Sequence, residues 1–172
     1  MSTLPTSTSA EIDRVADLIK DVRVAFLTTV AADGKLHARP MGCLSHRFDG
    51  TLWFFTRAES EKVDEVVRDR DVAVTYQNTS GNDYVAVAGK ATVVRDRAKA
   101  KELWNPILKA WFPDGLDDPQ LELLRIDVQT ASWWDGPASK FVRLYEYAKA
   151  IATHTTAKMG DQGTVNLQPT TR

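Results

Sequence analysis

The sequence predicts a mainly β protein with flanking helices, folded as an antiparallel barrel or sandwich with helices at its rim. Short runs rich in β-branched and aromatic residues recur along the chain, and turn signals such as Asp33-Gly34 and Asp49-Gly50 separate them. Strands and helices do not alternate regularly, so a parallel sheet is not expected. A chain of 172 residues with 43% hydrophobic residues is large enough for one core, which we expect within a single domain over residues 9–152.

The first half of the chain predicts one helix and three strands. Thr8-Ser9-Ala10-Glu11 has the pattern of a capping box, and apolar residues follow it at helical spacing over about residues 9–22. The expected strands cover residues 24–30, about 36–45, and 51–56. Pro40 interrupts the second strand. Because proline cannot donate to a strand ladder, Pro40 marks an edge, a bulge or a place where a ligand meets the strand.

The second half continues with the same kinds of element. A helix is expected from Ser60 to about Arg70, followed by a strand at 72–77 and a strand pair at 84–89 and 91–95 bent around Gly89-Lys90. A helical stretch at 96–111, broken by Pro106, and a loop at 111–119 come next. The last expected elements are strands at about 121–128 and 130–134 and a helix near 138–152. Residues 1–8 are expected to be a flexible N-terminus. Residues 153–172 are polar and aperiodic, which predicts a disordered tail.

Composition and missing motifs exclude several classes of function. The formal net charge is −1 and there is no basic block, so nucleic acid is not an expected partner. No apolar run is long enough for a membrane span and no secretory signal is visible, so a cytoplasmic location is expected. The lone Cys43 excludes an internal disulfide, and three scattered histidines give no metal-ligand spacing, so no metal is expected. With no obvious nucleophile or redox group in the chain, an enzyme of this sequence would depend on a cofactor.

One local pattern fits an anion. The strand that ends at Thr56 turns into a helix that begins near Ser60, with Lys62 in its first turn. A helix N-terminus has unpaired N–H groups and partial positive charge, so it can hold a phosphate. Arg39, on the strand that precedes the one ending at Thr56, can add a bidentate contact. The same residues also fit a simple helix cap and solvated surface cations.

The motifs resemble those of the FMN-binding split barrels related to pyridoxamine 5′-phosphate oxidase. The resemblance rests first on Arg39-Pro40-Met41, Trp53-Phe54-Phe55-Thr56 and Ser60-x-Lys62. The general stress protein branch is indicated by Trp104-Asn105-Pro106, Trp111-Phe112-Pro113-Asp114-Gly115 and Trp133-Trp134-Asp135-Gly136-Pro137. Together these motifs cover about residues 10–150 in consistent order.

The resemblance implies an antiparallel split β-barrel, a homodimer, and FMN bound in grooves between the subunits. Small molecules would then donate and accept the electrons. The expected contacts with the phosphate are Arg39, Lys62 and Ser60, and those along the isoalloxazine are Met41 and the adjoining Pro40. Phe55 and Thr56 are expected along the ribityl chain and Gln77 at a polar edge of the ring. Trp104, Trp111 and Phe112 are expected to close the groove, with the other subunit as their expected source. Neither Arg39 nor Lys62 is expected in the core, so the double alanine variant is expected to lose FMN and keep the fold.

Two departures argue against pyridoxamine phosphate as the substrate. Glu61 stands where the oxidases commonly carry an arginine, and Arg57 is the residue expected to compensate for its charge. Arg143-Leu144-Tyr145-Glu146 also lacks the proline of the oxidases' substrate-binding segment. The alternatives that stay open are a non-catalytic protein that stores or senses flavin, a deazaflavin or haem on the same barrel, and a dimer with an empty groove. The acid or base of any reaction is unidentified, with His37 as a weak candidate.

Overall fold

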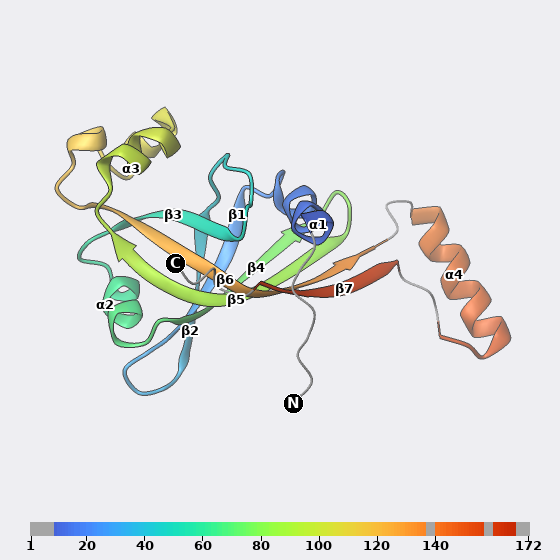
Figure 1. The fold of residues 1–172 in the computed structure, drawn as a ribbon. Coiled ribbons are helices and arrows are strands. Elements are labelled where there is room, and N and C mark those ends of the chain that lie inside the picture. Colours follow the sequence, from blue (N-terminus) through green and yellow to red (C-terminus); the bar gives the residue numbers. More distant parts are fainter. Residues whose placement is uncertain (1–8, 137–139, 157–159, 168–172) are drawn as a thin grey trace.

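A strongly curved antiparallel sheet organises the chain (Figure 1). The computed structural model describes residues 9–136, 140–156 and 160–167. The sheet runs in the order β2-β1-β4-β5-β6-β3, and β7 pairs with β6 outside this path. The strands are β1 (Val24–Val30), β2 (Leu36–Gly42), β3 (Thr51–Arg57), β4 (Asp71–Asn78), β5 (Asp83–Val94), β6 (Leu121–Asp135) and β7 (Asp161–Asn166).

The sheet curls into a half-barrel, which confirms the predicted fold class. Its edge strands β2 and β3 approach each other without pairing, so the barrel is open between them. Pro40 of β2 lies opposite Phe26 of β1. Strand β2 is an edge strand of the sheet, which is one of the positions that the proline indicated. Alternate side chains of the strands point inward and form the core, which includes Leu27, Phe54, Val74, Val87 and Ile126.

Helices lie around the sheet and at its ends. They are α1 (Ser9–Ile19), α2 (Glu61–Arg68), α3 (Arg97–Leu103) and α4 (Lys140–Thr153), with two short 3-10 turns, η1 (Pro106–Ala110) and η2 (Gly115–Asp117). The apolar side of α1 packs on the inner face of the sheet, and α2 follows β3 at another part of the barrel (Figure 1). Figure 1 shows α4 standing apart from the barrel, and its Leu144, Tyr147 and Ile151 are exposed. None of the helices in the described ranges is long and apolar enough to cross a membrane.

The predicted strands at 121–128 and 130–134 are one strand, β6. The division into two strands is wrong, and the structure has a bulge at that point. Gly89 pairs with Val128 and Ala88 with Thr130, so Gln129 is the extra residue on β6. The predicted pair at 84–89 and 91–95 is likewise one strand, β5, so its division is wrong, and the expected bend at Gly89 coincides with the register shift between Ala88 and Gly89.

The prediction of a disordered tail is wrong for residues 161–166, which form β7. Here Val165 and Leu167 are buried, and every residue from Asp161 to Asn166 pairs with β6. A polar strand can form here because its backbone groups pair with the unpaired edge of β6. Within β7 only Val165 is a buried apolar side chain, and a single such residue does not show as a periodic pattern in the sequence. The expected flexible N-terminus, residues 1–8, lies outside the described part of the chain, as do 157–159 and 168–172 of the expected tail.

Replacing Gly163 with alanine is expected to detach β7 from the barrel. A Cβ at Gly163 would overlap the indole ring of Trp133, which is buried on β6. We expect the unfolding free energy to fall by roughly 1–3 kcal/mol, with a red shift of tryptophan emission. Gln162→Ala, at an exposed position of the same strand, is the control. Unchanged urea unfolding and emission in Gly163→Ala would show that β7 does not pack on Trp133.

Candidate functional site

The buried carboxylate of Glu65 on α2 is the centre of the site. It is 3% exposed and takes three contacts from the first two strands. Thr29 of β1 donates its hydroxyl to Oε2 at 2.6 Å, Arg39 of β2 donates Nη2 to Oε2 at 2.7 Å, and Nδ1 of His37 lies 2.7 Å from Oε1. Arg39 Nη1 also donates to the Thr29 hydroxyl. The network joins the edge strand to the helix and fixes the direction of the Arg39 side chain.

Hydrogen bonding decides the charge of Glu65. Burial raises the pKa of this carboxyl, but the hydrogen bonds from Thr29, His37 and Arg39 outweigh it, so the pKa lies below its ordinary value. Glu65 therefore stays ionised at neutral pH and balances the charge of Arg39. Arg39 was expected to be a free phosphate ligand. In the structure its guanidinium already forms an ion pair with the Glu65 carboxylate of α2.

The pH dependence of unfolding follows from this lowered pKa. A carboxyl whose pKa is lower in the folded state stabilises that state above its ordinary value of 4.5, and this contribution is lost as the pH falls through the folded value. We expect the difference in unfolding free energy between the wild type and Glu65→Gln to be largest near neutral pH and to shrink below 4.5. Urea unfolding across that range measures it. A difference that stays constant down to about pH 3 would contradict the ionised state of Glu65.

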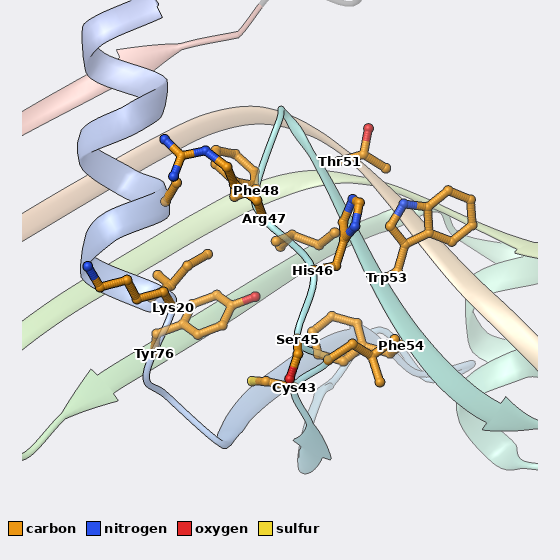
Figure 2. Close-up of a pocket in the computed structure, with 14 residues that line it drawn as sticks. Lys20, Cys43, Ser45, His46, Arg47, Phe48, Thr51, Trp53, Phe54 and Tyr76 are labelled. Atoms are coloured by element: carbon orange, nitrogen blue, oxygen red, sulfur yellow. The ribbon is translucent and has the colours of Figure 1, made fainter. Parts of the chain in front are cut away.

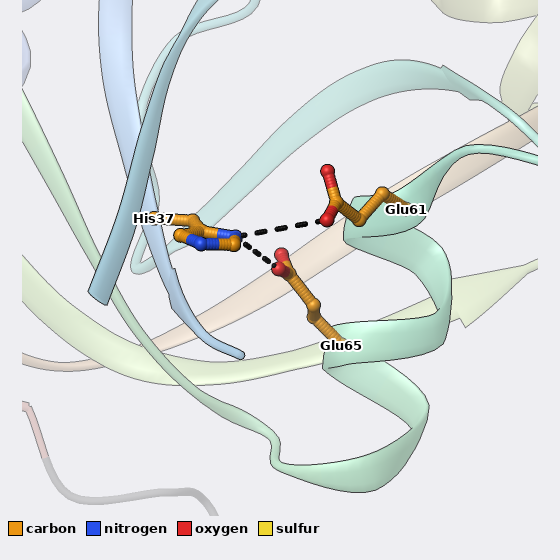
Figure 3. Close-up of side chains that lie close together, drawn as sticks. All are labelled: His37, Glu61 and Glu65. Carbon is orange, nitrogen blue, oxygen red and sulfur yellow. Dashed lines mark hydrogen bonds and ion pairs between the residues drawn. The ribbon is translucent and has the colours of Figure 1, made fainter. Parts of the chain in front are cut away.

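His37, Glu61 and Glu65 come together in a way that the sequence analysis missed (Figure 3). His37 Nδ1 lies 3.8 Å from a Glu61 oxygen, and possible ligand atoms of all three lie within 4.8 Å of one another. Two spacings could have revealed the group: His37 shares a strand face with Arg39, and Glu61 and Glu65 are one helical turn apart. The adjacent guanidinium of Arg39 already neutralises Glu65, which makes the trio a poor cation site.

Lys62 is the cation left for a ligand. It is half-buried in the first turn of α2, and within the described residues no hydrogen bond or ion pair holds its ammonium. Burial, and then the nearby charge of Arg39, lower the pKa of Lys62, while Glu65 opposes the shift. A lowered pKa means that the folded protein holds this positive charge at a cost. An anion bound between Lys62 and Arg39 would remove that cost.

Ser60 occupies the N-cap position as predicted, but its side chain does not cap the helix. Its hydroxyl donates to the carbonyl of Arg57 at 2.7 Å and lies 3.2 Å from the buried Thr56 hydroxyl. The first N–H groups of α2 are therefore left without a side-chain acceptor from this residue. The structure therefore brings Thr56 and Ser60 together at the start of α2, and it brings Arg39 close enough to Lys62, in the first turn of that helix, for the two charges to interact.

A group of aromatic rings lies on the outer side of β3. Phe55 contacts Trp104 edge-on, with ring centroids 5.7 Å apart, and the Phe112 centroid lies 6.2 Å from that of Phe55. Arg57 donates to the backbone carbonyl of Trp111 at 3.1 Å, which ties the turn after η1 to the end of β3. The predicted aromatic residues thus gather within one subunit, and the Trp111 ring is 59% exposed.

Three predicted residues lie elsewhere. Met41 is buried in the core, so only its backbone borders the open edge of β2. Pro40 and Gln77 face outward, on the opposite face of the sheet from Arg39 and Met41. Within one chain, Gln77 is therefore not part of the site around Lys62.

Comparison with known proteins gives a consistent result. Residues 10–158 match the model of a family described as pyridoxamine 5′-phosphate oxidase like. General stress protein 26 of Bacillus subtilis is 33% identical over 118 residues, which cover 66% of this chain and 81% of that protein. A putative general stress protein 26 from Jannaschia sp. CCS1 superposes with a TM-score of 0.74 at 26% identity, covering 92% of this chain and 99% of that one. A structure described as the general stress FMN/FAD binding protein of Xanthomonas citri has a TM-score of 0.64 at 28% identity, covering 74% and 90%.

Proposed function

Because the chain belongs to the pyridoxamine 5′-phosphate oxidase-like family, we propose that it binds FMN and acts as a flavin-dependent oxidoreductase of the general stress type. The observation that carries the proposal is the unpaired ammonium of Lys62, half-buried beside Arg39 at the mouth of α2. A phosphate monoester carries the charge that this arrangement lacks, and helix N–H groups and a lysine are common phosphate ligands. The relative from Xanthomonas citri, described as FMN/FAD binding, supports a flavin as the phosphate's carrier.

The residues present fit the rest of an FMN molecule. From the phosphate at Lys62, the ribityl chain would pass the hydroxyls of Ser60 and Thr56, which are already hydrogen-bonded to each other. The ring would lie along the open edge of β2, whose outer backbone groups have no strand partner in the sheet. The rings of Phe55, Trp104 and Phe112 would give it apolar surroundings.

We propose further that the protein is a homodimer that buries the outer face of its sheet. Phe26, Tyr84 and Trp134 all point outward and are exposed, and Phe26 is 51% exposed. Tyr84 lies between Gln77 and Trp134 in neighbouring ladder positions, so these three form one surface row. Such a patch is typical of an interface. A dimer through this face would also carry Gln77 toward the flavin of the other subunit.

In this proposal the residues of the chain would bind and orient the flavin. When bound, FMN would supply the redox chemistry between a small-molecule donor and an acceptor. Lys62 and Arg39 would hold the phosphate, and the aromatic group would exclude water from one side of the groove. Glu61 at the helix mouth disfavours further negative charge beyond a single phosphate. We place the protein in the cytoplasm.

The test of the redox part is anaerobic reduction of the reconstituted protein with NADH or NADPH, followed at the visible flavin bands. Bleaching by a pyridine nucleotide, and recovery on adding an acceptor, is the expected result. Dithionite is the positive control for a reducible flavin. If dithionite bleaches the bands and neither nucleotide does, these nucleotides are not the donors and the storage alternative gains support. Sedimentation of the wild type against Phe26→Asp tests the dimer, with a fall to monomer mass as the expected result.

A further inference from the structure

A cavity lies about α1, the segment between β2 and β3, and the start of β3 (Figure 2). Its volume is about 290 Å³. An apolar protein cavity of about 150 Å³ holds one benzene molecule, so this one has room for two fused rings. Aromatic side chains form much of its wall, namely Phe48, Trp53, Phe54 and Tyr76.

Two polar atoms in this cavity have no partner among the described residues. Tyr76 is 5% exposed, its hydroxyl points into the cavity in Figure 2, and it makes no hydrogen bond. His46 lies across the cavity, and its Nε2 is enclosed and equally unpaired. Buried polar groups are almost always hydrogen-bonded, so the enclosed His46 Nε2 indicates a missing partner in that space, and the Tyr76 hydroxyl faces the same hollow.

The cavity is suited to an uncharged occupant. Burial raises the pKa of the Cys43 thiol to about 11 and raises the pKa of Tyr76 as well, so both stay protonated at neutral pH. The charged residues at the rim are already paired, Lys20 with Asp17 at 3.4 Å and Arg47 with Asp13 at 2.5 Å. The Tyr76 hydroxyl is thus a neutral donor beside the aromatic part of the wall.

This cavity is separate from the anion site. Arg39, Met41 and Cys43 succeed one another on the same side of the β2 segment, which puts the Cys43 wall about 13 Å from Arg39 at the rise of an extended strand. Met41 stands between them and is buried in the core. A ligand in the cavity would therefore contact neither Lys62 nor Glu65.

We propose that this cavity binds a small, neutral, bicyclic aromatic molecule that accepts a hydrogen bond from Tyr76. The rings would pack against Trp53 and Phe54, and the acceptor atom would satisfy the tyrosine hydroxyl. This site does not depend on the binding of flavin.

Quinoline and naphthalene make a matched pair of probes, since they have nearly the same shape and only quinoline has an acceptor nitrogen. Equilibrium dialysis of the full chain should show one quinoline per subunit, bound roughly fivefold tighter than naphthalene, as one neutral hydrogen bond provides. Tyr76→Phe should remove this preference and retain the ring binding. Cys43→Phe, which fills the cavity, should weaken both probes, and the anion 1-naphthoate should bind more weakly than either.

Lys62→Ala is the control, because it should leave quinoline binding unchanged whether or not the protein binds FMN. Saturating FMN should leave it unchanged as well. The proposal would be overturned if the wild type did not bind quinoline, or if Tyr76→Phe preferred quinoline over naphthalene as strongly as the wild type does. Competition between quinoline and FMN would overturn it as well.

Discussion

Replacing Lys62 with alanine is expected to weaken FMN binding roughly 10- to 100-fold, which corresponds to the loss of one hydrogen bond to a charged group. Lys62 is the described cation at the helix mouth that no acidic side chain pairs with, and its lowered pKa shows that its charge lacks compensation. Titration of FMN fluorescence against protein measures the affinity. The fold should be unaffected, because the side chain is half-exposed.

Two controls make this prediction specific to the phosphate. Lys101→Ala removes an exposed lysine from α3 and should leave FMN affinity unchanged. Riboflavin, which has the same ring without the phosphate, should bind the wild type and Lys62→Ala with equal affinity. If Lys62→Ala bound FMN as tightly as the wild type, the phosphate would lie elsewhere.

Arg39→Ala is expected to lower the unfolding free energy by roughly 3–5 kcal/mol, the range for removing one partner of a buried ion pair. The carboxylate of Glu65 would stay buried with the Thr29 hydroxyl and His37 as its remaining partners. Because Arg39 is paired with a buried carboxylate, we no longer expect Arg39 and Lys62 both to be replaceable without harm to the fold. Urea unfolding followed by far-UV circular dichroism measures the loss.

The matched control is Arg47→Ala, which breaks an ion pair with Asp13 on the surface. Both side chains of that pair are more than half exposed, and exposed pairs contribute about 1 kcal/mol or less. In addition, the double variant Arg39→Met with Glu65→Leu should recover much of the stability lost in Arg39→Ala, because no charge is then left buried. Equal losses in Arg39→Ala and Arg47→Ala would show that the Glu65 network does not support the fold.

Much of the fold could be predicted because its signals are local. The Asp33-Gly34 turn, the edge position of Pro40 and the bend at Gly89 each follow from the backbone chemistry of one or two residues, and the structure has all three. The strand at 161–166 was missed because its stability comes from pairing with β6, while its own sequence is polar. Tertiary context of this kind leaves little trace in the strand itself.

The site was predictable to a similar extent and for similar reasons. The proximity of Ser60 and Thr56, with Lys62 in the first turn of the helix, follows from a strand that turns directly into a helix, and the structure has it. The engagement of Arg39 by Glu65 was not foreseen, since it depends on how α2 packs across β1 and β2. Spacing alone places each residue on its own element and does not give the distance between elements.

The absorbance spectrum of the purified protein, taken before and after addition of excess FMN and removal of unbound flavin on a desalting column, shows directly whether the protein binds flavin. We expect visible flavin bands in at least the second sample, close to one flavin per subunit, and their loss in Lys62→Ala. A wild-type protein that keeps no flavin bands after this treatment would contradict this expectation.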